Sequence, residues 1–198
     1  MTPKIIVYHS VLGIRQGEKN LAERMRKLGF EVIVQDLYEG KVFDDYESGL
    51  ALFEEMGVMG LVAQAQKGLE GMEGPVIFSG FSNGGALAEV MTLQYPQTVG
   101  CLLFHAALPV EEIGAAEWPK EVPVQVHYAD KDPWREEEYV EKFLEQVAAS
   151  GSPVTFHEYH TKGHLFTDPT LPDEYNEKAA EELYRHVTQF LNSFAGNE

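Results

Sequence analysis

The chain has 198 residues, a formal net charge of −17 at pH 7 and a single cysteine, Cys101. This length predicts one domain over residues 1–198, and the charge argues against nucleic-acid and anionic-membrane partners because both would repel the protein. The lone cysteine excludes an intrachain disulfide, and the apolar stretch near residue 5 is too short for a signal peptide or a membrane span. We therefore expect a cytoplasmic protein.

Short apolar runs alternate with helical patterns along the chain. The runs that predict strands lie at residues 4–9, 30–37, 75–80, 99–108, 122–130 and 153–160, the last alternating like an edge strand. The helical patterns lie at residues 17–29, 44–71, 83–96, 135–151 and 172–194, and the second has a break near Gly57 and Gly60. This order predicts an α/β fold with a mostly parallel central sheet and helices on both faces. Ligands bind such sheets beyond the carboxyl ends of the strands.

The third predicted strand runs directly into a glycine-rich turn that contains Ser82. Residues 80–84 match the pattern G-x-S-x-G between a strand and a helix. A nucleophilic serine needs such a sharp turn to raise its hydroxyl above the sheet, and the glycines leave room for the strand and helix to approach. The backbone N–H of Asn83 would then face a developing oxyanion. The alternative is that Ser82 only caps the helix that follows.

A serine nucleophile needs a base and an acid, and in this type of fold they follow the serine in the order acid, then histidine. The end of the fifth predicted strand offers Asp130 and Asp132, and the loop after the sixth offers His160 and His164. We favour His164 because it lies in the loop before two apolar residues that could hold its ring. We favour Asp132 as the acid, which leaves Asp130 as a turn residue.

With these motifs, the chain resembles the dienelactone hydrolase family of α/β-hydrolases over nearly its whole length. The resemblance rests on "HSVLG", "DLYEG", "GFSNGG", "YADKDPW" and "GHLF". It implies a triad of Ser82, Asp132 and His164, with the backbone N–H groups of Val11 and Asn83 as the oxyanion hole.

Three positions depart from the family pattern. Ser82 stands where the best-known members carry a cysteine, and Cys101 lies in the following strand, where we expect it to be buried. Asp168 stands where dienelactone hydrolases hold a substrate carboxylate with an arginine, and we expect it to repel an anion. Ser10 replaces an acidic residue that tunes the cysteine. These changes favour a serine esterase over an enzyme that takes dienelactone itself.

Apolar and aromatic residues near the expected site are candidates for its substrate pocket, because pockets for small ligands are mostly apolar. These candidates are Leu12, Phe81, His105 and Trp134. His105 could equally be a structural histidine, and Trp118 could equally line the pocket or pack a loop. No metal is expected, because the His160-x-x-x-His164 spacing falls in a loop, and no nucleotide cofactor is expected, because no phosphate-binding glycine pattern is present.

We therefore expect a serine hydrolase that cleaves a small ester, lactone or thioester, acting as a monomer or homodimer without a cofactor. The alternative from another class is a non-catalytic α/β-hydrolase fold that binds a small molecule or a protein. The complete order of serine, aspartate and histidine argues against that alternative, since a binding module needs no triad.

Overall fold

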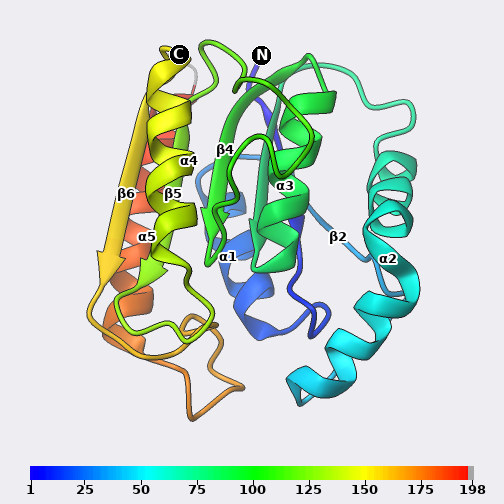
Figure 1. Cartoon of the computed structure of the whole chain (residues 1–198), viewed down its shortest axis with the longest axis vertical. Helices are drawn as coiled ribbons and strands as arrows, with labels where there is room; N and C mark the ends of the chain where they lie inside the picture. The colour runs from blue at the N-terminus through cyan, green and yellow to red at the C-terminus, as the bar shows by residue number, and fades with distance from the viewer. Residues whose placement is uncertain (196–198) are drawn as a thin grey trace.

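A computed structural model describes residues 1–195, in which six parallel strands form one central sheet (Figure 1). The strands are β1 (Lys4–Tyr8), β2 (Val32–Gln35), β3 (Val76–Phe81), β4 (Thr98–Phe104), β5 (Val124–Ala129) and β6 (Val154–Tyr159). Their order across the sheet is β2-β1-β3-β4-β5-β6, and each neighbouring pair is parallel. The predicted α/β fold is confirmed, and β6 lies at an edge of the sheet, as its sequence indicated.

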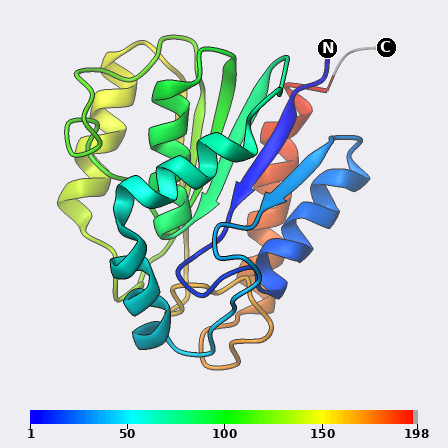
Figure 2. The ribbon, with the colours of Figure 1, turned by 90° about the vertical axis from the view of Figure 1, so that its right-hand side faces the viewer.

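Five helices cover the two faces of the sheet (Figures 1 and 2). They are α1 (Gln16–Lys27), α2 (Tyr46–Gly68), α3 (Asn83–Gln94), α4 (Glu137–Ala149) and α5 (Glu177–Asn192). The core cluster on one face contains buried residues of α2, α3 and α4, whereas the cluster on the other contains those of α1 and α5. Figure 2 shows the sheet between these two layers. The continuous apolar strands follow from this arrangement, because both faces of each central strand are covered.

The boundaries of two helices differ from the sequence prediction. Helix α2 is interrupted at Gly57, whose φ of 67° lies in the left-handed region, but not at Gly60. Helix α5 begins at Glu177 rather than near residue 172, because the side chain of Asn176 accepts a hydrogen bond from the Ala179 N–H and so caps the helix. Residues 160–176 are therefore one long loop between β6 and α5.

The parallel sheet brings the ends of its strands to one edge of the molecule. Ser82 follows β3, Asp132 follows β5 and His164 follows β6, so all three lie beyond the carboxyl ends of their strands. Cys101 is fully buried in β4, as expected. Within residues 1–195, no helix has the length and apolar character needed to cross a membrane.

Candidate active site

Ser82 occupies the turn between β3 and α3 in a strained backbone conformation. Its φ of 55° and ψ of −122° are unusual for a residue with a side chain. The turn is held by hydrogen bonds from the Ser82 N–H to the Phe104 carbonyl and from the Gly85 N–H to the Ser82 carbonyl, both 2.8 Å. Although Ser82 is at the N-cap position of α3, its side chain caps no N–H of that helix. The hydroxyl is therefore available for another partner.

Glycines around Ser82 allow main-chain segments to approach one another closely. A Cβ at Gly80 would overlap the carbonyl of Gly84, and a Cβ at Gly84 would overlap the carbonyls of Tyr8 and His9 at the end of β1. The turn after β3 and the first turn of α3 are thus packed directly against the start of the loop that follows β1. No residue larger than glycine fits at either position without a shift of the backbone.

The side chains of Ser82, His164 and Asp132 form one chain of hydrogen bonds. His164 Nε2 lies 2.8 Å from Ser82 Oγ, and His164 Nδ1 lies 2.7 and 2.9 Å from the two carboxylate oxygens of Asp132. A carboxylate only accepts, so Nδ1 carries the proton and Nε2 accepts from the hydroxyl. Burial alone would raise the pKa of Asp132, but the hydrogen bond and charge of His164 outweigh it and lower that pKa. Asp132 therefore remains ionised opposite the imidazole.

The other aspartate and histidine considered from the sequence bind each other. His160 Nδ1 lies 2.6 Å from Asp130 Oδ2, and the Thr161 N–H donates to the same carboxylate over 3.0 Å. The His160 side chain is 86% exposed, whereas His164 is buried. Neither Asp130 nor His160 contacts the Ser82 hydroxyl within the described residues.

The two backbone N–H groups predicted to form the oxyanion hole belong to Val11 and Asn83. Asn83 is the first residue of α3, directly after Ser82, and Val11 lies in the turn that follows β1. Neither N–H has an acceptor among residues 1–195. The first turn of α2 packs closely against this segment, since a Cβ at Gly49 would overlap the Val11 carbonyl oxygen. Both donors thus lack an acceptor within the described residues, as an oxyanion hole requires.

The proposed pocket residues occupy different environments. Trp134 is 53% exposed, and its ring centroid lies 6.2 Å from that of His164, in agreement with a position in the wall of the site. Leu12 and Phe81 have 0% and 1% exposed surface, and Phe81 stacks on Phe104 in the core. Phe81 is therefore a core residue and not a pocket wall, which corrects the sequence-based expectation, whereas Leu12 is buried yet lines a cavity with Arg15 and Tyr46.

His105 and Trp118 also differ in their relation to the site. The His105 ring lies 5.4 Å from the His164 ring, is almost fully buried, and has no hydrogen-bond partner within the described residues. Burial lowers the pKa of His105 to about 3, so this ring stays neutral. Trp118 lies against Phe143 of α4 and donates its indole N–H to the Val122 carbonyl over 3.0 Å. It therefore packs a loop and lines no part of the site.

A cavity of about 450 Å³ includes Leu12, Arg15 and Tyr46 among its walls, whereas Ser82, Asp132 and His164 are not among its lining residues. The Tyr46 ring lies 6.2 Å from the His164 ring, and no sequence motif predicts this contact, because Tyr46 begins α2 in a stretch without one. Asp168 does not face this cavity as an anion-repelling group. It is buried and its carboxylate accepts from Arg15 Nε over 2.9 Å, so its charge is paired inside the protein.

Arg15 is held so that none of its donors is free for a ligand. Besides Asp168, it donates to the Asp44 carboxylate and to the Phe43 carbonyl through Nη1, and to Thr170 through Nη2. No motif singled out this buried cation. Among residues 1–195, no group of three or more histidine, cysteine, aspartate or glutamate side chains has the arrangement of a metal site.

The comparisons with known proteins agree with this fold. One solved structure that this chain resembles is a dienelactone hydrolase-like promiscuous phosphotriesterase from metagenomic libraries, with 19% identity, a TM-score of 0.79, and coverage of 98% of this chain and 87% of that one. Another is an esterase from Pyrobaculum calidifontis, with 13% identity, a TM-score of 0.65, and coverage of 98% and 77%. No curated protein matched the chain. The model of the dienelactone hydrolase family matches residues 1–195, and the chain therefore belongs to this family of hydrolases that act on ester bonds.

Proposed function

We propose that this protein is a serine hydrolase that cleaves a small ester, lactone or thioester through an acyl-enzyme. The observation that carries the proposal is the hydrogen-bonded chain from Asp132 through His164 to Ser82, with spacings of 2.7 and 2.8 Å. A strained nucleophile turn, a base and an orienting acid in this arrangement are what nucleophilic catalysis requires.

The first half of the reaction forms the acyl-enzyme. His164 Nε2 accepts the Ser82 proton while Ser82 Oγ attacks the substrate carbonyl carbon, and the carbonyl π electrons move to oxygen. The N–H groups of Val11 and Asn83 donate to this oxyanion. When the tetrahedral intermediate collapses, the bond to the leaving group breaks and His164 gives its proton to the leaving oxygen or sulfur.

The second half releases the acid and restores the enzyme. His164 takes a proton from a water molecule, whose oxygen attacks the acyl carbon, and the proton then returns to Ser82 Oγ as the ester bond breaks. Asp132 favours the imidazolium in both halves because it is ionised and bonded to Nδ1. The neutral ring of His105 adds no positive charge beside that imidazolium.

The segment between the acid and the histidine favours a small substrate. It holds only α4, β6 and short loops, so this segment contributes no large lid. Small esters need no such lid, whereas its absence disfavours long-chain lipids.

Replacement of Ser82 tests the proposal directly. We expect Ser82→Ala to reduce kcat/KM for p-nitrophenyl acetate by at least about 10³-fold, because the acyl-enzyme cannot form. Ser193→Ala, at an exposed serine after α5, serves as the matched control and should retain wild-type activity. If Ser82→Ala stays fully active, Ser82 is not the nucleophile. A wild-type protein inert to a panel of small esters would favour the non-catalytic binding module.

A further inference from the structure

Glu174 belongs to no sequence motif, yet its carboxylate accepts a hydrogen bond from the loop that carries His164. Glu174 Oε2 accepts a hydrogen bond from the Leu165 N–H over 2.7 Å, directly after His164 in the chain. The same carboxylate accepts from the Tyr46 hydroxyl, with distances of 2.8 and 3.1 Å to its two oxygens. One side chain therefore links the histidine loop to the first residue of α2.

The backbone of Glu174 also meets the residue that precedes His164. A Cβ at Gly163 would overlap the carbonyl group and the Cα of Glu174, so only glycine allows this approach. The chain is thus held on both sides of His164, at residue 163 by main-chain contact and at residue 165 by a carboxylate. This double contact restricts the position of the imidazole.

Tyr46 supplies a third contact, this time with the imidazole itself. Its ring centroid lies 6.2 Å from that of His164 at an interplanar angle of 62°, and 5.8 Å from that of Trp134. Burial raises the pKa of Tyr46, and the charge of Glu174 raises it further, so the hydroxyl remains a donor. The bond to Glu174 therefore fixes the ring that packs beside the catalytic base.

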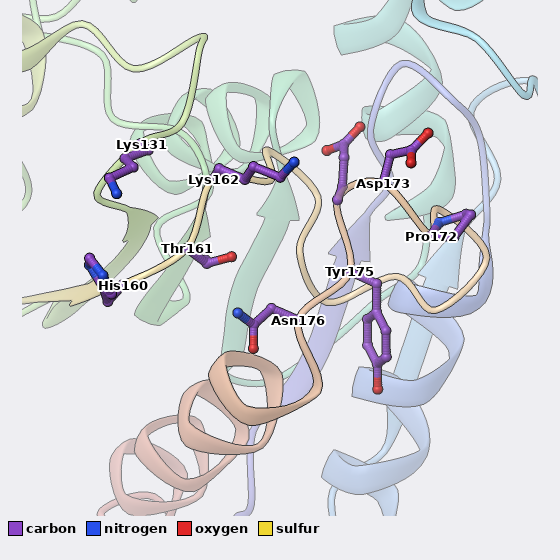
Figure 3. Close-up of a pocket in the computed structure, with 9 residues that line it drawn as sticks. Lys131, His160, Thr161, Lys162, Pro172, Asp173, Tyr175 and Asn176 are labelled. Atoms are coloured by element: carbon purple, nitrogen blue, oxygen red, sulfur yellow. The ribbon is translucent and has the colours of Figure 1, made fainter.

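No cation competes for the Glu174 carboxylate within the described residues. Glu174 also lines a second cavity of about 440 Å³, whose other walls include Lys131, Lys162 and Asp173 (Figure 3). Figure 3 shows Lys131 and Lys162 on one side of this cavity and Asp173 on the other. Among residues 1–195, neither lysine forms an ion pair with Glu174, so its partners are the Leu165 N–H and the Tyr46 hydroxyl.

We propose that Glu174 is a positioning residue, which holds His164 in hydrogen-bonding distance of Ser82 through Leu165 and Tyr46. The inference rests on the proposed function, in which His164 is the base. Glu174 touches no reacting atom, so its effect is on the geometry of the base. Loss of this geometry slows proton transfer in both halves of the reaction and leaves substrate binding largely intact.

Four variants test this role with p-nitrophenyl acetate. We expect Glu174→Ala to lower kcat by about 10- to 100-fold with a change in KM below about threefold, since small displacements of a catalytic group have effects of this size. Tyr46→Phe removes only the hydroxyl and should give a smaller loss of kcat. Glu174→Gln keeps the length and an acceptor oxygen, so it should recover most of the activity. Glu177→Ala, at an exposed glutamate three residues away, is the control with wild-type kinetics.

Each result has a defined meaning, and Tyr46→Phe keeps the test valid if Glu174→Ala does not fold. Wild-type kcat in both Glu174→Ala and Tyr46→Phe would overturn the proposal. A rise in KM with unchanged kcat would show that Glu174 binds substrate instead, and failure of Glu174→Gln to recover activity would show that its charge, not its bonds, matters. If Ser82→Ala remains active, the proposed function fails, whatever the Glu174 variants show.

Discussion

Replacing Asp132 by asparagine changes one oxygen to an NH₂ group and keeps the shape of the side chain. In the native protein both carboxylate oxygens lie within 2.9 Å of His164 Nδ1, and one also accepts from the Trp134 N–H over 2.9 Å. The Trp134 N–H directs the amide oxygen of an asparagine toward itself, which turns the NH₂ group toward Nδ1. His164 must then accept at Nδ1 and carry its proton on Nε2, so it cannot take the proton of Ser82.

The expected loss of kcat/KM has two causes: His164 adopts the wrong tautomer, and the negative charge opposite the imidazolium is removed. Comparable changes in serine triads reduce turnover by about 10⁴-fold, which corresponds to about 5.4 kcal/mol of transition-state stabilisation. We therefore expect kcat/KM of Asp132→Asn for p-nitrophenyl acetate at pH 7.5 to fall by about 10³- to 10⁴-fold. The protein should stay folded, because the amide fits the same space.

Asp130→Asn is the matched control, since Asp130 lies two residues away and pairs with the exposed His160. It should retain at least about half of the wild-type kcat/KM, because an exposed pair of this kind contributes little. If Asp130→Asn lost as much activity as Asp132→Asn, or if Asp132→Asn kept more than a tenth of the wild-type value, the assignment of the acid would be refuted.

Three further predictions concern stability and selectivity. Burial, and then the neighbouring His186, lower the pKa of His157 to about 4, so the folded protein binds fewer protons than the unfolded chain as the pH falls from 6.5 toward 4. Urea unfolding should thus give a lower free energy of unfolding at pH 5 than at pH 7.5. The difference between the two pH values should be smaller in His157→Gln, and an equal difference in the variant would exclude His157 as its source. Gly80→Ala should lower the free energy of unfolding by about 1–3 kcal/mol because its Cβ overlaps the Gly84 carbonyl, whereas Gly60→Ala on α2 should not, because its Cβ would meet only the Met56 Cβ at 3.8 Å; equal melting temperatures would contradict the packing argument. Asp45, Asp173 and Glu174 line the cavity that Tyr46 also lines, and the Tyr46 ring lies 6.2 Å from that of His164. Because Arg15 has no free donor to offset these carboxylates, a carboxylate-bearing ester should show about tenfold lower kcat/KM than a neutral ester of equal length; faster turnover of the anionic ester would refute this reasoning.

The sequence predicted most of the framework of this site for physical reasons. A strained turn between a strand and a helix needs glycines, and those glycines mark Ser82 in the sequence. Parallel strands bring residues that follow β5 and β6 to the same edge, so the chain order of Asp132 and His164 was informative. These signals depend on local sequence and strand order, both of which are visible in the chain itself.

The remainder of the site depends on contacts that no local pattern encodes. Tyr46 and Glu174 meet across 128 positions of sequence, and Glu174 lies in a loop without periodicity that was interpreted as the start of α5. Phe81 ends β3, where successive side chains alternate between the two covered faces of the sheet, and its ring packs in the core against Phe104. Arg15 and Asp168 likewise meet only through the folded loops.

Covalent labelling by a fluorophosphonate, followed by peptide mapping, tests the central claim most directly. The probe bonds to the oxygen of an activated serine and loses fluoride, so it reports the nucleophile without depending on the natural substrate. The account predicts one adduct per chain, on Ser82, formed rapidly in the wild-type protein and at least about 10²-fold more slowly in His164→Gln. An adduct on another serine, or equal labelling rates in the two proteins, would contradict the account.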